Sequence, residues 1–156
     1  MSELDFMRRA IELSRLNATS AGGGPFGAVV VQAGRIVGEG ANRVVPDHDP
    51  TAHAEIVAIR AACRTLRSHV LDGCVIYTSC EPCPMCLGAI WWARIGEIVY
   101  GNDRVDAAAA GFDDDVLYRE MAAPLDERRL PLRRMSADEA RAAFELWLAN
   151  PDRVAY

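Results

Sequence analysis

The spacing of apolar residues divides the chain into helical and strand-like segments. Leu4, Met7 and Ile11 recur at helical intervals, and the pattern predicts a helix over residues 3–18. A second helix is predicted over 51–67, begun by Pro50 and capped by Asp49 or Thr51. Further helices are predicted at 84–93, at 116–121 and from the Ser136-Ala137-Asp138-Glu139 capping box to about residue 148. Strand-like runs lie at 28–31, 35–39, 74–79 and 97–100.

The order of these segments predicts the topology. Ala33-Gly34 separates the first two strand-like runs, as in a hairpin. The strand–helix–strand succession from 74 to 100 is a βαβ unit, which implies parallel pairing of its strands. The chain has no internal repeat and no linker-like stretch. Residues 1–156 are therefore predicted to form one α/β domain, with helices on both faces of a mixed sheet.

Composition removes several classes of function. The chain has no lysine, since all 17 basic residues are arginine, which excludes Schiff-base chemistry and a P-loop lysine. A net charge of −5 argues against a nucleic-acid partner. Four arginines near the C-terminus, at 128, 129, 133 and 134, fit a solvated face in so acidic a chain.

Neither a membrane nor a secretory route is indicated by the sequence. The apolar runs are too short to span a bilayer, and the first residues are acidic with no apolar signal region. The five cysteines are an odd number without a secretory context. We therefore expect a cytoplasmic protein with reduced thiols.

The candidate chemistry lies in His53-Ala54-Glu55 and in Pro82-Cys83-Pro84-Met85-Cys86. One imidazole and two thiolates are good zinc ligands, and three protein ligands leave the fourth tetrahedral position to water, as in catalytic sites. If Pro84 begins a helix, Cys83 and Cys86 lie on one side of its first turn. His53 and Glu55 converge only at a helix N-terminus, so two helix N-termini are predicted to meet at one zinc ion.

Other readings of these residues stay open on the sequence alone. Cys80 is regularly spaced with Cys83 and Cys86 and would complete a closed structural site with four protein ligands. Such a site would suit a non-catalytic, zinc-stabilised binding module. It would have no use for Glu55, whereas a catalytic site would use this carboxylate to move protons. An iron–sulfur run fails because residues 87–90 contain no cysteine.

The chain resembles the cytidine-deaminase-like superfamily, and within it the bacterial guanine deaminases. His-x-Glu joined to Pro-Cys-x-x-Cys is a signature of zinc-dependent nucleobase deaminases. Gly111-Phe112-Asp113-Asp114 and the terminal Tyr156 are the features that point to guanine. The other matching stretches are 24–28, 49–55, 78–90 and 106–108.

The resemblance implies a fold, a reaction and a cofactor. The fold is a three-layer α/β/α sandwich with a mixed five-stranded sheet. The reaction is hydrolytic deamination of a free nucleobase, guanine to xanthine and ammonia, with cytosine, a triazine, a nucleoside or tRNA adenosine as alternative substrates. One catalytic Zn²⁺ per subunit is held by His53, Cys83 and Cys86, and Glu55 is the catalytic residue.

The resemblance also assigns the substrate-binding residues. Asn42 binds the purine ring, Asp114 accepts hydrogen bonds from the base edge, and Tyr156 closes the pocket. Phe26 and Trp92 form apolar walls, and Ala54 belongs to the same set. The family further implies a domain-swapped homodimer, in which the segment from about 136 to 156 is exchanged and Tyr156 serves the partner's site. Asp115 and Ala155 depart from the family pattern at the lip of the pocket.

Overall fold

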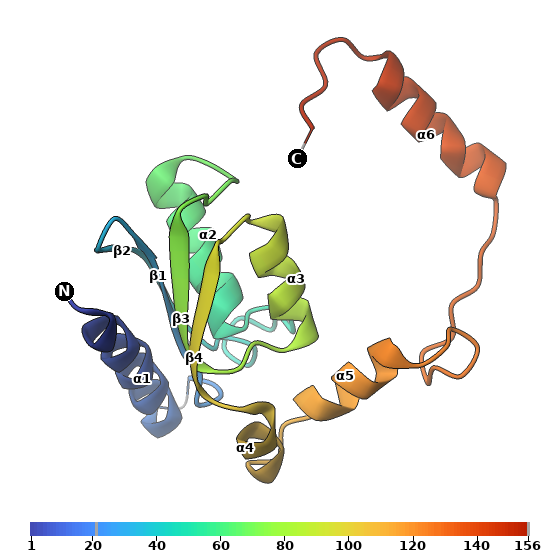
Figure 1. Cartoon of the computed structure of the whole chain (residues 1–156). Helices are drawn as coiled ribbons and strands as arrows, with labels where there is room; N and C mark the ends of the chain where they lie inside the picture. Colours follow the sequence, from blue (N-terminus) through green and yellow to red (C-terminus); the bar gives the residue numbers. More distant parts are fainter. Residues whose placement is uncertain (21, 156) are drawn as a thin grey trace. The chain divides into compact units, whose positions relative to one another are not determined.

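The computed structural model describes residues 1–20 and 22–155 (Figure 1). The chain divides into two compact units, Met1–Tyr118 and Arg119–Tyr156. All the strands and the candidate site belong to the first unit. That residues 1–156 function as one deaminase domain stays a prediction.

The centre of the first unit is a mixed sheet with the strand order β2-β1-β3-β4. β1 pairs antiparallel with both β2 and β3, whereas β3 and β4 run parallel. The predicted hairpin and the predicted βαβ unit are therefore both confirmed. The strands are β1 (Gly27–Gln32), β2 (Arg35–Ala41), β3 (Cys74–Cys80) and β4 (Glu97–Asn102).

The five-stranded sheet implied by the resemblance is wrong for the part of the chain that the structure describes. The sheet there has four strands, and β4 lies at its edge. After β4 the chain forms helices rather than another strand. Further along, residues 131–136 have no regular secondary structure. Pro131 has no backbone N–H to give to a sheet ladder.

Helices cover both faces of the sheet, so the three-layer arrangement is confirmed (Figure 1). Alternation along the strands sends Val29 and Tyr77 to one face and Val30 and Ile76 to the other. The first face packs against α1 (Glu3–Thr19), and the second against α2 (Ala54–Leu66) and α3 (Pro84–Trp92).

Two glycines of β2 set how closely α2 approaches the sheet. A Cβ added at Gly38 or Gly40 would clash with the backbone of α2. For Gly40 the first atom met is the carbonyl oxygen of Ala54, the first residue of the helix. The absence of these side chains therefore fixes the position of the start of α2, where His53 lies.

α2 begins three residues later than the sequence pattern predicts. Asp49 accepts hydrogen bonds from the backbone N–H of Thr51 at 2.8 Å and from its hydroxyl at 2.6 Å, which forms a local turn. Such side chain–backbone bonds compete with helix formation. The residue at the N-cap is His53, with extended backbone dihedral angles.

The helices after β4 differ in part from expectation. α4 (Arg104–Ala109) was not predicted, although Asp103 and Asp106 form a capping box at its start. α5 (Asp114–Ala122) and α6 (Ala137–Ala149) form where helices were predicted. The capping box at Ser136 is wrong, because this residue has a positive φ of 53° and its side chain caps nothing. None of the helices within residues 1–20 and 22–155 has the length and apolar character needed to cross a bilayer.

Candidate active site

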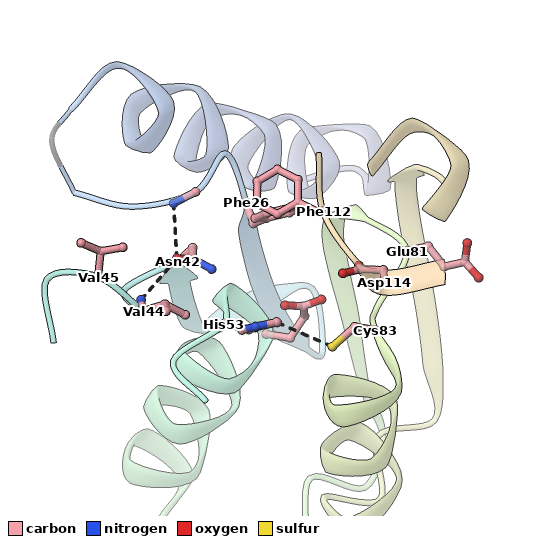
Figure 2. A pocket seen from close by; sticks show the side chains of 11 residues that line it. Phe26, Asn42, Val44, Val45, His53, Glu81, Cys83, Phe112 and Asp114 are labelled. Atoms are coloured by element: carbon pink, nitrogen blue, oxygen red, sulfur yellow. Dashed lines mark hydrogen bonds between the residues drawn. The ribbon is translucent and has the colours of Figure 1, made fainter. Parts of the chain in front are cut away.

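The N-termini of α2 and α3 meet at one point, as the sequence predicts. His53 is the N-cap of α2 and Cys83 is the N-cap of α3, with Cys86 in the first turn of that helix. His53 Nδ1 lies 3.6 Å from Cys83 Sγ (Figure 2). One ligand atom each from His53, Cys83 and Cys86 lies within 4.8 Å of the other two. This arrangement brings together side chains from two helices that are about 30 residues apart in sequence.

The three side chains fit a zinc ion in both chemistry and spacing. Tetrahedral zinc, with Zn–S of about 2.3 Å and Zn–N of about 2.0 Å, holds its ligand atoms roughly 3.5 to 3.8 Å apart. The 3.6 Å separation of His53 Nδ1 and Cys83 Sγ falls within this range. Two thiols and an imidazole are also the donors that zinc prefers. A three-ligand group of this kind leaves one position open for water.

Cys80 is not part of this group. Its Sγ hydrogen-bonds to the carbonyl oxygen of Asp103 at 3.7 Å, and burial raises the pKa of its thiol to about 12. Among the described residues, the group that could hold a metal ion therefore has three members, and the closed four-ligand alternative loses its fourth ligand.

A hydrogen bond links the two cysteines of the group. The Cys86 thiol hydrogen-bonds to the Cys83 sulfur, which lowers the pKa of Cys83 to about 4 and raises that of Cys86. The same sulfur raises the pKa of His53 by hydrogen bonding to its ring. The start of α3 therefore favours a thiolate at Cys83, as expected beside the positive end of a helix.

Glu55 lies in the first turn of α2 and is only 6% exposed. Burial raises the pKa of its carboxyl group to about 7, although a hydrogen bond from its own backbone N–H partly opposes this shift. A carboxyl group with a pKa near 7 can both accept and donate a proton at neutral pH.

A pocket of about 230 Å³ opens in front of these residues (Figure 2). Its walls come from the loop before β1, the loop after β2, the starts of α2 and α3, and the start of α5. The lining residues are Gly24, Phe26, Asn42, Val44, Val45, His53, Glu55, Glu81, Cys83, Phe112 and Asp114.

Three of the predicted substrate-binding residues, Phe26, Asn42 and Asp114, lie in this pocket. Asn42 is oriented by its Oδ1, which accepts the backbone N–H groups of Gly24 and Val44 at 3.3 Å each. This arrangement leaves its amide nitrogen for a ligand. Asp114 is half-buried, and the loss of water around it raises the pKa of its carboxyl group.

Of the other predicted residues, Trp92 and Ala54 do not line this pocket. Trp92 ends α3 with a 60% exposed side chain, and it does not line the pocket of its own chain. Its ring lies under the Arg94 guanidinium, 5.8 Å from the ring centre. Ala54 is fully buried in the core between α2 and the sheet. Tyr156 lies outside the described residues.

Phe112 is the main pocket residue that received no role from the sequence. Its ring meets that of Phe26 edge-on, with centroids 4.7 Å apart and planes at 75°. Together the two rings form an apolar wall of the pocket. The available signal was its place within Gly111-Phe112-Asp113-Asp114, because loop residues have no periodicity to reveal which way they point.

The chain matches a family of known enzymes over most of its length. Residues 1–102 match the model for the cytidine and deoxycytidylate deaminase zinc-binding region. The chain therefore belongs to this family of zinc-dependent deaminases, which are hydrolases.

Individual relatives extend the likeness beyond the zinc site. Guanine deaminase from Bacillus subtilis (strain 168) is 48% identical over 147 residues, which are 94% of each chain. The X-ray structure of guanine deaminase from Bacillus subtilis superposes with a TM-score of 0.96 and 46% identity, covering 100% of this chain and 99% of that one. A tRNA-specific adenosine deaminase from Haemophilus influenzae is 41% identical over 121 residues, 72% of this chain and 69% of that protein.

Proposed function

We propose that this protein hydrolyses guanine to xanthine and ammonia. The observation that carries the proposal is the nearly full-length likeness to the Bacillus guanine deaminase, at 48% identity over 94% of both chains. The pocket supports it, because a three-ligand zinc group, a buried carboxyl group and an aromatic wall converge there. A cytoplasmic location and the absence of a nucleic-acid partner belong to the same proposal.

The reaction needs a nucleophilic water and a group that moves protons. His53, Cys83 and Cys86 would hold the zinc ion, which supplies a Lewis acid that makes water nucleophilic near neutral pH. Glu55 takes a proton from the water and delivers protons to the ring nitrogen and to the departing amine. A C–O bond forms at the ring carbon that carries the amino group, its C–N bond breaks, and ammonia leaves.

Asn42 and Asp114 would orient the base. Asn42 donates its amide N–H to an acceptor on the ring, since its Oδ1 is already engaged. Asp114 accepts a hydrogen bond from a ring N–H. Guanine has such a group, whereas a base whose ring nitrogen is substituted does not. Phe26 and Phe112 contact the flat base.

Purified, zinc-loaded protein is expected to release ammonia from guanine faster than from cytosine, adenine, their nucleosides or triazines. The screen measures ammonia from each compound at the same concentration. No turnover of guanine or of close aminated relatives would reject the proposal. Strong, salt-dependent binding of a tRNA anticodon arm, with deamination of its adenosine, would support the tRNA editor instead.

We further propose a homodimer in which the C-terminal segment, from about 136 to 156, is exchanged so that Tyr156 closes the partner's pocket. α6 lies in this segment and carries apolar residues that remain exposed within the chain. Exposed apolar residues in this number indicate an interaction surface. The exposed apolar residues of α6 are Phe144, Leu146, Trp147 and Leu148.

The exchange can be tested by mixing two defective subunits. We expect Glu55→Gln and a chain lacking Tyr156 each to be weakly active alone. Co-expressed and co-purified, they should regain about a quarter of wild-type activity, because half of the dimers would be mixed and each would hold one complete site. Two separately purified, unmixed samples are the control. No regain in mixed dimers verified by mass spectrometry would contradict the exchange, and full activity without Tyr156 would remove its role in the pocket.

A further inference from the structure

A hydrogen bond connects α5 to the residue before a zinc ligand. The Tyr118 hydroxyl donates to the carbonyl oxygen of Pro82 at 2.7 Å. Pro82 is buried and immediately precedes Cys83, the N-cap of α3. Tyr118 and Pro82 both lie in the unit Met1–Tyr118. The bond therefore joins the middle of α5 to the residue that precedes a ligand of the candidate metal group.

α5 has no fully buried side chain, and Asp114 and Tyr118 are among its half-buried residues. The hydrogen bond of Tyr118 to Pro82 is therefore one of the specific contacts that orient this helix. Asp114 and Tyr118 are one turn apart, and residues spaced by four lie on the same face of a helix. A bond that fixes Tyr118 therefore also fixes the direction in which Asp114 points.

A second set of contacts supports the same connection. The Arg104 guanidinium lies over the Tyr118 ring, 4.8 Å from its centre. The backbone N–H of Arg104 donates to Glu81 Oε2 at 3.0 Å, and Glu81 is the neighbour of Pro82. Glu81 thus contacts Arg104, Pro82 contacts Tyr118, and Arg104 contacts Tyr118. Because Glu81 and Pro82 are neighbours in the chain, the four residues form a closed ring of contacts beside the pocket.

We infer that Tyr118 is a positioning residue, which through its hydrogen bond to Pro82 holds the first turn of α5 so that Asp114 faces the pocket. The inference rests on the proposed role of Asp114 in binding guanine. Tyr118 itself does not line the pocket, so its effect on the reaction passes through Asp114. Removing only its hydroxyl leaves the metal group and the Asp114 carboxyl group chemically unchanged.

The test is a double-mutant cycle with Tyr118→Phe, Asp114→Ala and both together. Tyr118→Phe is expected to lower kcat/KM for guanine about 3- to 10-fold, mainly by raising KM, which is the range that one uncharged hydrogen bond supports. Bound zinc should not change. In the Asp114→Ala background the same substitution should change kcat/KM less than about 2-fold, because the residue it positions is gone. Tyr100→Phe, at a half-exposed tyrosine on β4, is the matched control and should leave kcat/KM unchanged.

A second readout does not depend on the substrate. Amide hydrogen exchange in residues 114–118 should become several-fold faster in Tyr118→Phe, while exchange in α3 stays the same. Unchanged exchange in this segment, or a full-size kinetic effect of Tyr118→Phe without Asp114, would overturn the inference. Failure of the wild-type protein to act on guanine would reject the proposed function instead, and the exchange result would still decide whether Tyr118 orders α5.

Discussion

Glu55→Gln is expected to lower kcat for guanine by roughly 10² to 10⁴-fold, the range over which general acid–base groups contribute. Glutamine has nearly the same shape and fills the same buried space, but it cannot accept and return a proton. The carboxyl group is well suited to both steps, because burial brings its pKa to about 7. Zinc content and folding should stay close to wild type, since Glu55 is not one of the three candidate ligands.

Steady-state ammonia release, metal analysis and circular dichroism on the same preparation would test this expectation. Glu97→Gln is the matched control, because Glu97 is an exposed carboxylate on β4, away from the pocket. A Glu55→Gln variant that turns guanine over within a few-fold of wild type would show that another group moves the protons. Loss of zinc in this variant would show instead that Glu55 supports the metal.

His53→Ala, Cys83→Ala and Cys86→Ala are each expected to reduce bound zinc to near zero and turnover to background. Two remaining protein ligands cannot hold the ion at the affinity of three. Cys80→Ala should retain zinc and activity, because the Cys80 sulfur is bound to the Asp103 carbonyl oxygen outside the group. Metal analysis after gel filtration distinguishes the four variants.

Cys80→Ala is the control for the three ligand substitutions. The substitution removes a buried thiol of the same kind from the same stretch of chain. Zinc loss in Cys80→Ala, with retention in Cys83→Ala or Cys86→Ala, would show that the wrong pair of cysteines had been chosen. Circular dichroism identifies a variant that loses zinc only because it fails to fold.

The sequence predicts the metal group well because its chemistry leaves few choices. His53, Cys83 and Cys86 carry donor atoms that zinc prefers, and their short spacings restrict how they can converge. Proline at position 84 also indicates where α3 begins, and the structure has Cys83 at its N-cap. Local chemistry therefore determines both the ligands and their position.

The walls of the pocket are predicted less well, because they depend on how distant segments pack. Trp92 and Phe112 are both aromatic, yet only Phe112 lies at the pocket, where it contacts Phe26 from a loop some 86 residues away. Nothing in the local pattern states which aromatic side chain points inward. The direction in which Asp114 points is equally hard to predict from local sequence, since it depends on the contact between Tyr118 and the distant Pro82.

The boundaries of helices and strands are likewise predicted well where only the local pattern decides them, and less well where other hydrogen bonds compete. The pattern of β1, β2 and β3 follows directly from short β-rich runs. The start of α2 is shifted because Asp49, a good cap by residue type, bonds to Thr51 instead. Ser136 is a residue type that often caps helices, but its backbone does not have the dihedral angles of an N-cap.

Neither His53 nor Cys83 caps its own helix, although both occupy N-cap positions. Serine or aspartate at these positions would accept a backbone N–H and stabilise the helix by roughly 1 kcal/mol. The chain uses both positions for metal donors instead. Zinc binding and the stability of the fold are therefore expected to be coupled. Without zinc, the protein would be less stable to unfolding as well as inactive.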